Sequence, residues 1–88
     1  MNESIDPKKF GLPARTILEQ IAFNVIAIVM QRKSRIIMAD GKKIVEKARK
    51  IQDVLPDVIV VLKTCAPVCG KTVVFLEREG VEVTPLSE

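Results

Sequence analysis

Two short runs of apolar, mostly β-branched residues enclose an amphipathic segment, and this arrangement constrains the fold more than any other feature of the chain. The first run covers residues 23–30 and the second covers residues 58–62. Such runs are typical of strands buried on both faces, because β-branched side chains lose rotamer freedom in helices. Between them, residues 42–55 keep apolar side chains at helical spacing until Pro56 ends the segment. A strand, a helix and a strand in this order predict parallel pairing with a right-handed crossover.

The residues before this unit allow more than one interpretation. Residues 1–13 are mostly polar and hold two prolines, so we expect a flexible N-terminal arm there. We predict a short helix over residues 14–20 and a strand over residues 35–38 that pairs with residues 23–30. A rival interpretation continues the short helix through residue 30, because apolar residues also recur there at helical spacing.

The residues after the amphipathic segment complete the predicted fold. Asp40 is expected to cap the amphipathic helix, and a second helix follows a turn at Gly70 and ends near Glu79. Residues 81–83 alternate as an edge strand does. The order of elements is therefore helix, strand, strand, helix, strand, helix, strand. It predicts one α/β domain over residues 14–88, with a mixed, mostly parallel sheet of four strands flanked by two main helices.

The composition excludes several kinds of chemistry. The chain has no histidine, which removes the commonest general base, the commonest zinc ligand and every imidazole triad. Its aromatic residues are three phenylalanines, so stacking platforms for nucleotide bases are not expected. No two acids have a spacing that indicates shared acid–base catalysis. We therefore predict no catalytic residue, no metal and no cofactor.

The N-terminus and the cysteine content indicate a cytoplasmic protein. Residues 1–6 are polar and carry no apolar stretch of the kind that export signals need. Only two cysteines are present, which is typical of a reducing compartment. The longest apolar run, residues 21–30, is half the length of about 20 residues that a membrane-spanning helix requires.

Positive charge is concentrated in the first half of the chain. Residues 1–50 hold eleven Lys or Arg against five Asp or Glu, whereas residues 51–88 hold three against six. On the amphipathic helix three lysines share one strip with no acid between them, at about 100° per residue. If the turn at residues 31–35 lies nearby, six cations form a surface suited to a phosphate backbone. The predicted polyanion-binding residues are Arg32, Lys33, Arg35, Lys43, Lys47 and Lys50.

This basic surface supports the first functional hypothesis, a small non-enzymatic binding or regulatory module whose partner is a polyanion such as nucleic acid. The alternative is an ordinary solvated face, in which acids such as Asp57 or Glu79 neutralise the lysines. The shortage of aromatic residues favours contact with the phosphate backbone over reading of bases. Because the chain is small and its strands are weakly polar, a homodimer is a further hypothesis.

The turn that joins the second apolar run to the last helix is a second candidate site. Ligands of α/β sheets commonly bind where a strand leads into a helix, and helix N-terminal amides favour anions. A thiol at a helix N-terminus has a lowered pKa, so Cys65 could be reactive. Cys69 shares a helical stripe with apolar residues and is expected to face the core. This alternative site, for a small anion or a thiol reaction, would use Cys65, Gly70, Lys71 and Thr72.

Overall fold

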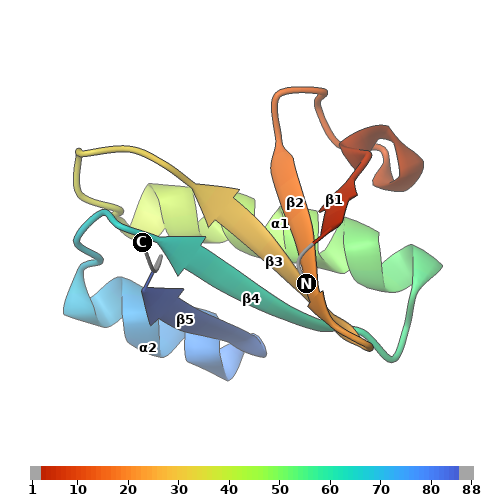
Figure 1. Cartoon of the computed structure of the whole chain (residues 1–88). Coiled ribbons are helices and arrows are strands. Elements are labelled where there is room, and N and C mark those ends of the chain that lie inside the picture. The colour runs from red at the N-terminus through yellow and green to blue at the C-terminus, as the bar shows by residue number, and fades with distance from the viewer. Residues whose placement is uncertain (1–2, 86–88) are drawn as a thin grey trace.

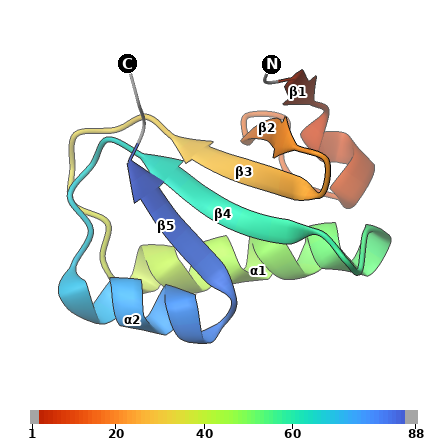
Figure 2. The ribbon, with the colours of Figure 1, turned by 60° about the horizontal axis from the view of Figure 1, so that its bottom comes forward.

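The computed structural model describes residues 3–85, which form a five-stranded mixed sheet with two α-helices packed on one of its faces (Figure 1 and Figure 2). The sheet order follows the chain. β2 pairs antiparallel with β1 and with β3, whereas β4 pairs parallel with β3 and with β5. The elements are β1 (Glu3–Ile5), the 3-10 helix η1 (Pro7–Phe10), β2 (Ile17–Ala22), β3 (Val25–Met30), α1 (Met38–Val54), β4 (Ile59–Thr64), α2 (Gly70–Arg78) and β5 (Val81–Pro85).

The face of the sheet that α1 and α2 cover holds the main core. Ile28 of β3 and Leu62 of β4 are at most 1% exposed, and they belong to one apolar cluster with Ile44, Ala48 and Ile51 of α1. Burying a side chain of this size contributes about 1.5–3 kcal/mol. The helical stripe read from the sequence is therefore the stripe that holds α1 against the sheet.

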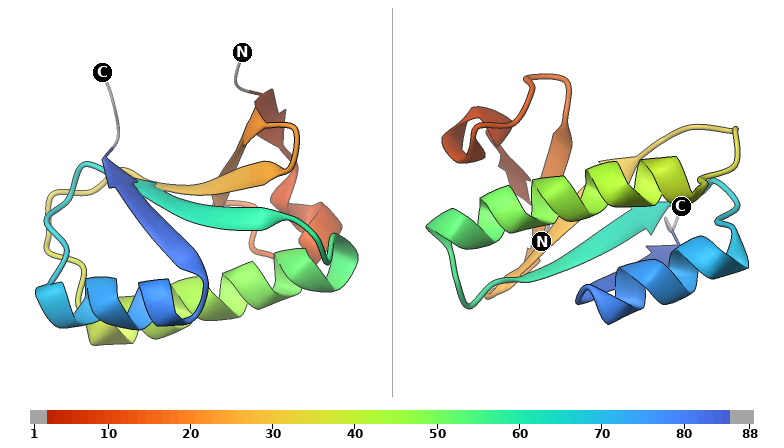
Figure 3. Two further views of the ribbon diagram at one scale, coloured as in Figure 1. Left: turned by 90° about the horizontal axis from the view of Figure 1, so that it is seen from below. Right: turned by 180° about the vertical axis from the view of Figure 1, so that it is seen from behind.

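The opposite face of the sheet carries a smaller apolar cluster, and no helix within residues 3–85 covers it (Figure 3). Ala27 and Val29 of β3 and Val61 of β4 are buried there. Lys63 of β4 forms an ion pair with Glu19 of β2, with Nζ and Oε1 3.2 Å apart. Because β3 lies between these two strands, this ion pair spans β3 on the face that carries the smaller cluster.

The helix predicted over residues 14–20 is wrong, and so is its continuation through residue 30. Residues 17–22 form β2, which pairs with β1 on one side and with β3 on the other. Leu18 is opposite Ile28 in this pairing and is 1% exposed. The short apolar pattern fits either element, and pairing with two neighbouring strands decides in favour of the strand.

The strand predicted over residues 35–38 is also wrong, because α1 begins at Met38. Only Ile36 pairs as a strand residue does, in an isolated bridge with Val68. Its N–H donates to Pro67 O at 2.9 Å, and its carbonyl accepts from Cys69 N–H at 3.0 Å. This segment therefore joins the loop before α1 to the loop before α2.

The α/β class and the mixed sheet are confirmed, whereas the number of strands and the mostly parallel pairing are not. The sheet has five strands, with two antiparallel and two parallel pairings. The additional strand comes from the segment expected as an arm, since residues 3–5 pair with β2. In the same segment Phe10 and Leu12 are buried in the main core.

The parallel pairing of β3 and β4 brings their carboxyl ends to the same edge of the sheet. The loop of residues 31–37 leaves β3 there, and the loop of residues 65–69 leaves β4 beside it. Both candidate sites from the sequence lie at or near this edge. No helix in the described part of the chain is long and apolar enough to cross a membrane.

Candidate polyanion-binding surface

Helix α1 has two flanks, and α2 packs along one of them (Figure 3). On that flank Arg49 forms an ion pair with Glu79 at 2.5 Å. The other flank carries Lys43, Lys47 and Lys50, which lie within about 60° of one another around the helix axis. Within residues 3–85 none of these lysines forms an ion pair. Glu79, which we considered from the sequence as a neutralising partner for the lysines, is therefore paired with Arg49 instead.

Lys47 is the most buried of the three lysines and lines a hollow of 310 Å³ at the carboxyl end of β3. Arg15 and Thr16, which lead into β2, line the same hollow, and so does Arg32 from the loop after β3. Apolar side chains of β2 and β3 and one glutamine complete the lining: Ile17, Ile28, Val29, Met30 and Gln31.

The charges around the hollow repel one another. Burial lowers the pKa of Lys47 below its ordinary value of 10.5, and the nearby charges of Arg15 and Lys43 lower it further. A lysine whose pKa is lowered costs folding free energy while it is protonated. Clusters of this kind are found more often at functional sites than elsewhere, because an anion can compensate them.

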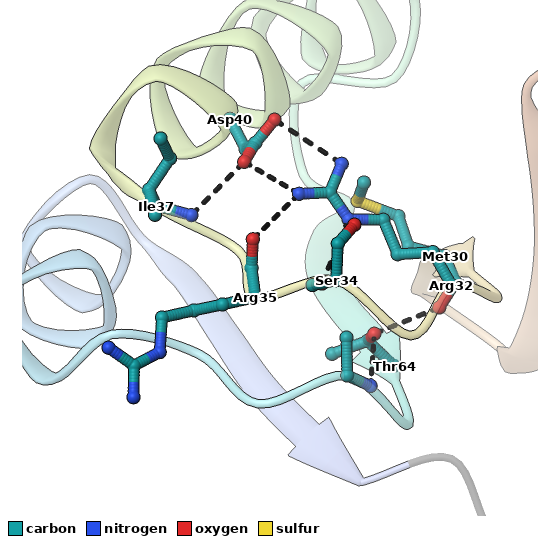
Figure 4. Close-up of polar contacts among 8 residues, drawn as sticks. Met30, Arg32, Ser34, Arg35, Ile37, Asp40 and Thr64 are labelled. Atoms are coloured by element: carbon teal, nitrogen blue, oxygen red, sulfur yellow. Dashed lines mark hydrogen bonds and ion pairs between the residues drawn. The ribbon is translucent and has the colours of Figure 1, made fainter.

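Arg32 differs from the other predicted cations because its charge is matched. Its Nη2 donates to Asp40 Oδ2 at 2.8 Å and to the carbonyl of Arg35 at 2.8 Å, and its Nε donates to the carbonyl of Ser34 (Figure 4). Asp40 also accepts from Ile37 N–H at 3.0 Å. This backbone N–H and the Arg32 guanidinium hold the pKa of Asp40 below 3.8. Arg32 thus orders the loop before α1.

Of the six cations predicted from the sequence, Arg32 and Lys47 line the hollow, and within residues 3–85 the other four do not. Lys33 and Arg35 are exposed in the loop after β3, and the Arg35 guanidinium points away from Arg32 (Figure 4). The charge of Arg35 acts instead on Cys69 at the start of α2. Sequence reasoning also missed Arg15, because it assigned residues 14–20, Arg15 included, to a helix.

The turn before α2 differs from its prediction in the roles of the two thiols. Cys69, not Cys65, is the N-cap residue of α2, and the N–H groups of Lys71 and Thr72 lower the pKa of its thiol. Cys65 is exposed, and its Sγ lies 3.8 Å from the carbonyl of Arg32. The helical stripe used for Cys69 does not apply, since the helix begins one residue later.

The other predicted residues of this turn differ from one another in exposure. Lys71 and Gly70 are exposed, and a Cβ added to Gly70 would meet no atom within 4 Å. Thr72 is 0% exposed and packs against Gly41 of α1, so its side chain faces the interior. Among the described residues, no three acidic or thiol side chains come together as metal ligands would.

These features define a small α/β domain with a cationic hollow beside the carboxyl end of β3. Two solved structures share its fold. One is EndoMS in apo form, with a TM-score of 0.65 and 16% identity over 82% of this chain. The other is an EndoMS–dsDNA complex, with a TM-score of 0.74 and 16% identity over 98% of this chain.

The chain spans about a third of the length of these two chains, 34% and 36% respectively. Identity at this level establishes the likeness of fold alone. No protein-family model matches the chain. A search of curated proteins gave no match either.

Proposed function

We propose that this chain is a small non-enzymatic module that binds nucleic acid through the cationic flank of α1. The observation that carries the proposal is that Arg15 and Lys47 line one hollow and Lys43 lies one helical turn from Lys47, with no ion pair to any of them within residues 3–85. Uncompensated cations that repel one another cost stability, and an anionic partner would relieve that cost.

The likeness of fold to EndoMS supports this proposal, because one of the two similar structures is a complex of that protein with dsDNA. The charge distribution supports it independently. Figure 3 shows that α2 leaves one flank of α1 open, and helical geometry puts Lys43, Lys47 and Lys50 on that flank. Both observations favour a polyanion over a neutral ligand.

Contact with the phosphate backbone is the proposed mode of binding. Phe10 is buried and Phe75 is partly buried, so they offer no surface for base stacking. Phe23 is 95% exposed, but it lies in the turn between β2 and β3, at the end of the sheet away from the hollow. Lysine and arginine side chains can bind phosphates without reading sequence.

Binding of a labelled DNA duplex, measured by fluorescence anisotropy over a range of salt concentrations, tests the proposal. We expect affinity to fall with salt at a logarithmic slope of about 0.9 per phosphate contacted. Replacing Lys43, Lys47 and Lys50 together by Gln should abolish binding. The matched control replaces Lys8, Lys42 and Arg78 by Gln, which removes the same charge from other surfaces. Equal loss in both triple variants would contradict a role for this flank.

A reactive-thiol site at the start of α2 is a second candidate function, favoured by the position of Cys69. The pKa of this thiol is lowered by two backbone N–H groups and by the charge of Arg35. We expect Cys69 to react with iodoacetamide at neutral pH faster than Cys65 does, as peptide mass spectrometry would show. Replacing Arg35 by Gln should slow the reaction of Cys69 alone. A faster Cys65 would dismiss this candidate.

Self-association is a third hypothesis, and the exposed apolar side chains on the open face of the sheet support it. Ile17 is 46% exposed and Ile59 is 51% exposed, on β2 and β4 respectively. Sedimentation velocity at several concentrations tests it, and a monomer throughout would reject it.

A further inference from the structure

We propose that the hollow lined by Arg15, Thr16 and Lys47 is a binding site for a single phosphate monoester, such as the phosphorylated end of a nucleic-acid strand. This inference rests on the proposed function and deepens it, because it names the chemical group that the cationic flank of α1 would bind most tightly. It also adds Arg15 and Thr16, which the sequence did not indicate, to the binding surface.

The charge at the hollow suits a doubly charged anion better than a singly charged one. Arg15 and Lys43 each lie close enough to Lys47 for their charges to act on it. Among residues 3–85 no acidic residue lines the hollow, and the nearby Asp40 is bound to Arg32. A phosphate monoester carries about 1.5 to 2 negative charges at neutral pH, whereas each internal phosphate of a nucleic acid carries one.

Thr16 provides a second, independent indication of a ligand. It is 8% exposed, lines the hollow, and its hydroxyl oxygen is buried with no hydrogen-bond partner among the described residues. The backbone of Thr16 is satisfied separately, since its N–H donates to Pro13 O at 3.0 Å. Buried hydroxyls are nearly always paired, and a rotation of the Thr16 side chain towards the hollow would let its hydroxyl donate a hydrogen bond to a phosphate oxygen there.

The size and the walls of the hollow also suit a phosphate attached to a sugar. Its volume of 310 Å³ is roughly ten times the share of about 30 Å³ that one water occupies in the liquid. Ile17 and Met30 present apolar atoms beside the cations. The guanidinium of Arg15 can hold two phosphate oxygens at once, while the carbon face of the sugar packs against these apolar walls.

Two DNA duplexes of identical sequence, one with 5′-phosphates and one with 5′-hydroxyl ends, test the inference by fluorescence anisotropy. We expect the phosphorylated duplex to bind about tenfold more tightly, which corresponds to about 1.4 kcal/mol. Inorganic phosphate and a nucleoside 5′-monophosphate serve as competitors. If the site is specific for strand ends, neither competitor should block binding of the duplex at micromolar concentration. If the site is for free phosphate or free nucleotide, the corresponding competitor should block it.

Single substitutions connect this preference to the hollow. Lys47→Gln and Thr16→Val should each remove the preference for the 5′-phosphate, and Thr16→Val does so without changing charge. Lys42→Gln is the matched control, because Lys42 lies on the same helix but outside the hollow, and it should keep the preference. In the unmodified protein, phosphate should shift the NMR signals of the Arg15 and Thr16 amides, a measurement that needs no variant to fold.

The outcomes separate the two proposals. Equal affinity for both duplexes overturns the inference and leaves the proposed function standing. Binding of phosphate and of the phosphorylated duplex, but not of the hydroxyl duplex, supports the monoester site and contradicts backbone contact. No binding of any probe overturns both. Phosphate-induced shifts at residues 70–72 instead of residues 15 and 16 overturn the inference in favour of the turn before α2.

Discussion

Asp40 connects the loop after β3 to the start of α1. Its carboxylate accepts a hydrogen bond from Ile37 N–H and forms an ion pair with Arg32, and Arg32 in turn holds the carbonyls of two loop residues. The sequence indicated Asp40 as the helix cap, but the N-cap residue is Ile37 and Asp40 lies three positions into the helix. An acid at this position still satisfies the backbone N–H of the N-cap residue.

Replacing Asp40 by Ala should lower the free energy of unfolding by about 1 kcal/mol at pH 7, the usual effect of losing a helix cap. The pKa of Asp40 is lowered in the folded state, so its contribution is present above pH 3.8 and is lost as the pH falls through the folded pKa. Urea denaturation at pH 7 and at pH 3 measures both effects, and the difference between the variant and the parent should shrink at pH 3.

Asp53→Ala is the matched control for this prediction, since Asp53 is an exposed acid on the same helix. Its stability should stay unchanged or rise slightly, because alanine is the better helix former. A loss in Asp53→Ala equal to that in Asp40→Ala would show that the contacts of Asp40 are not the cause.

At the scale of elements, the close approach of α1 and α2 depends on one glycine. Gly41 is buried, and a Cβ added to it would lie 2.9 Å from Thr72 Cγ2 and 3.5 Å from Phe75 Cδ2. Thr72 is fully buried and β-branched, so its methyl group has little room to move. The glycine therefore sets the distance between the two helices.

Replacing Gly41 by Ala should lower the free energy of unfolding by about 1 kcal/mol, as judged by chemical denaturation. Overpacking of a core costs about 1–3 kcal/mol, and the gain in helix propensity offsets about 1 kcal/mol of that. Gly70→Ala is the control, because a Cβ there meets no atom within 4 Å. It should be neutral or stabilising, and an equal loss in both variants would refute the packing argument.

Elements that have a long periodic pattern were predictable from the sequence, whereas those that depend on neighbouring strands were not. The apolar stripe of α1 and the apolar run of β4 extend over enough residues to define one element each. β2 carries a pattern that fits a helix equally well, and its pairing on both sides decides the outcome. Local periodicity does not contain that information.

The candidate site likewise contains residues that were predictable from the sequence and one that was not. The strip of Lys43, Lys47 and Lys50 follows from helical geometry alone, and the structure keeps it free of ion pairs within residues 3–85. Arg15 joins Lys47 only because β2 begins beside the carboxyl end of β3. The sequence could not show this proximity once residues 14–20 had been assigned to a helix.

At the scale of the whole molecule, uneven charge costs stability. The basic first half of the chain places Arg15 and Lys47 in the lining of one hollow with Lys43 one helical turn away, and the folded protein holds Lys47 with a lowered pKa. Like charges one helical turn apart cost about 0.2–0.5 kcal/mol. A domain of this size gains little by keeping such repulsion, which is the reason for assigning the cluster a binding role.

Replacing Lys47 by Met should therefore raise the free energy of unfolding by about 0.2–0.5 kcal/mol at pH 7 in the absence of polyanions. The penalty of protonated Lys47 is full below its folded pKa and is gone above 10.5, so the gain should narrow as the pH rises towards that value. Chemical denaturation at pH 7 and pH 10 measures the change. Lys42→Met, on the exposed strip, should show no gain, and a destabilised Lys47→Met would contradict the argument.

The ion pair between Lys63 and Glu19 has a consequence for how this protein behaves at high concentration. This ion pair spans β3 on the face of Ala27, Val29 and Val61, where many α/β proteins place a second layer of helices. We therefore expect solubility to depend on Lys63, a residue outside the main core. Replacing Lys63 by Ala would enlarge the exposed apolar surface beside Ile17 and Ile59. We expect the turbidity of concentrated solutions to rise while the protein is still folded.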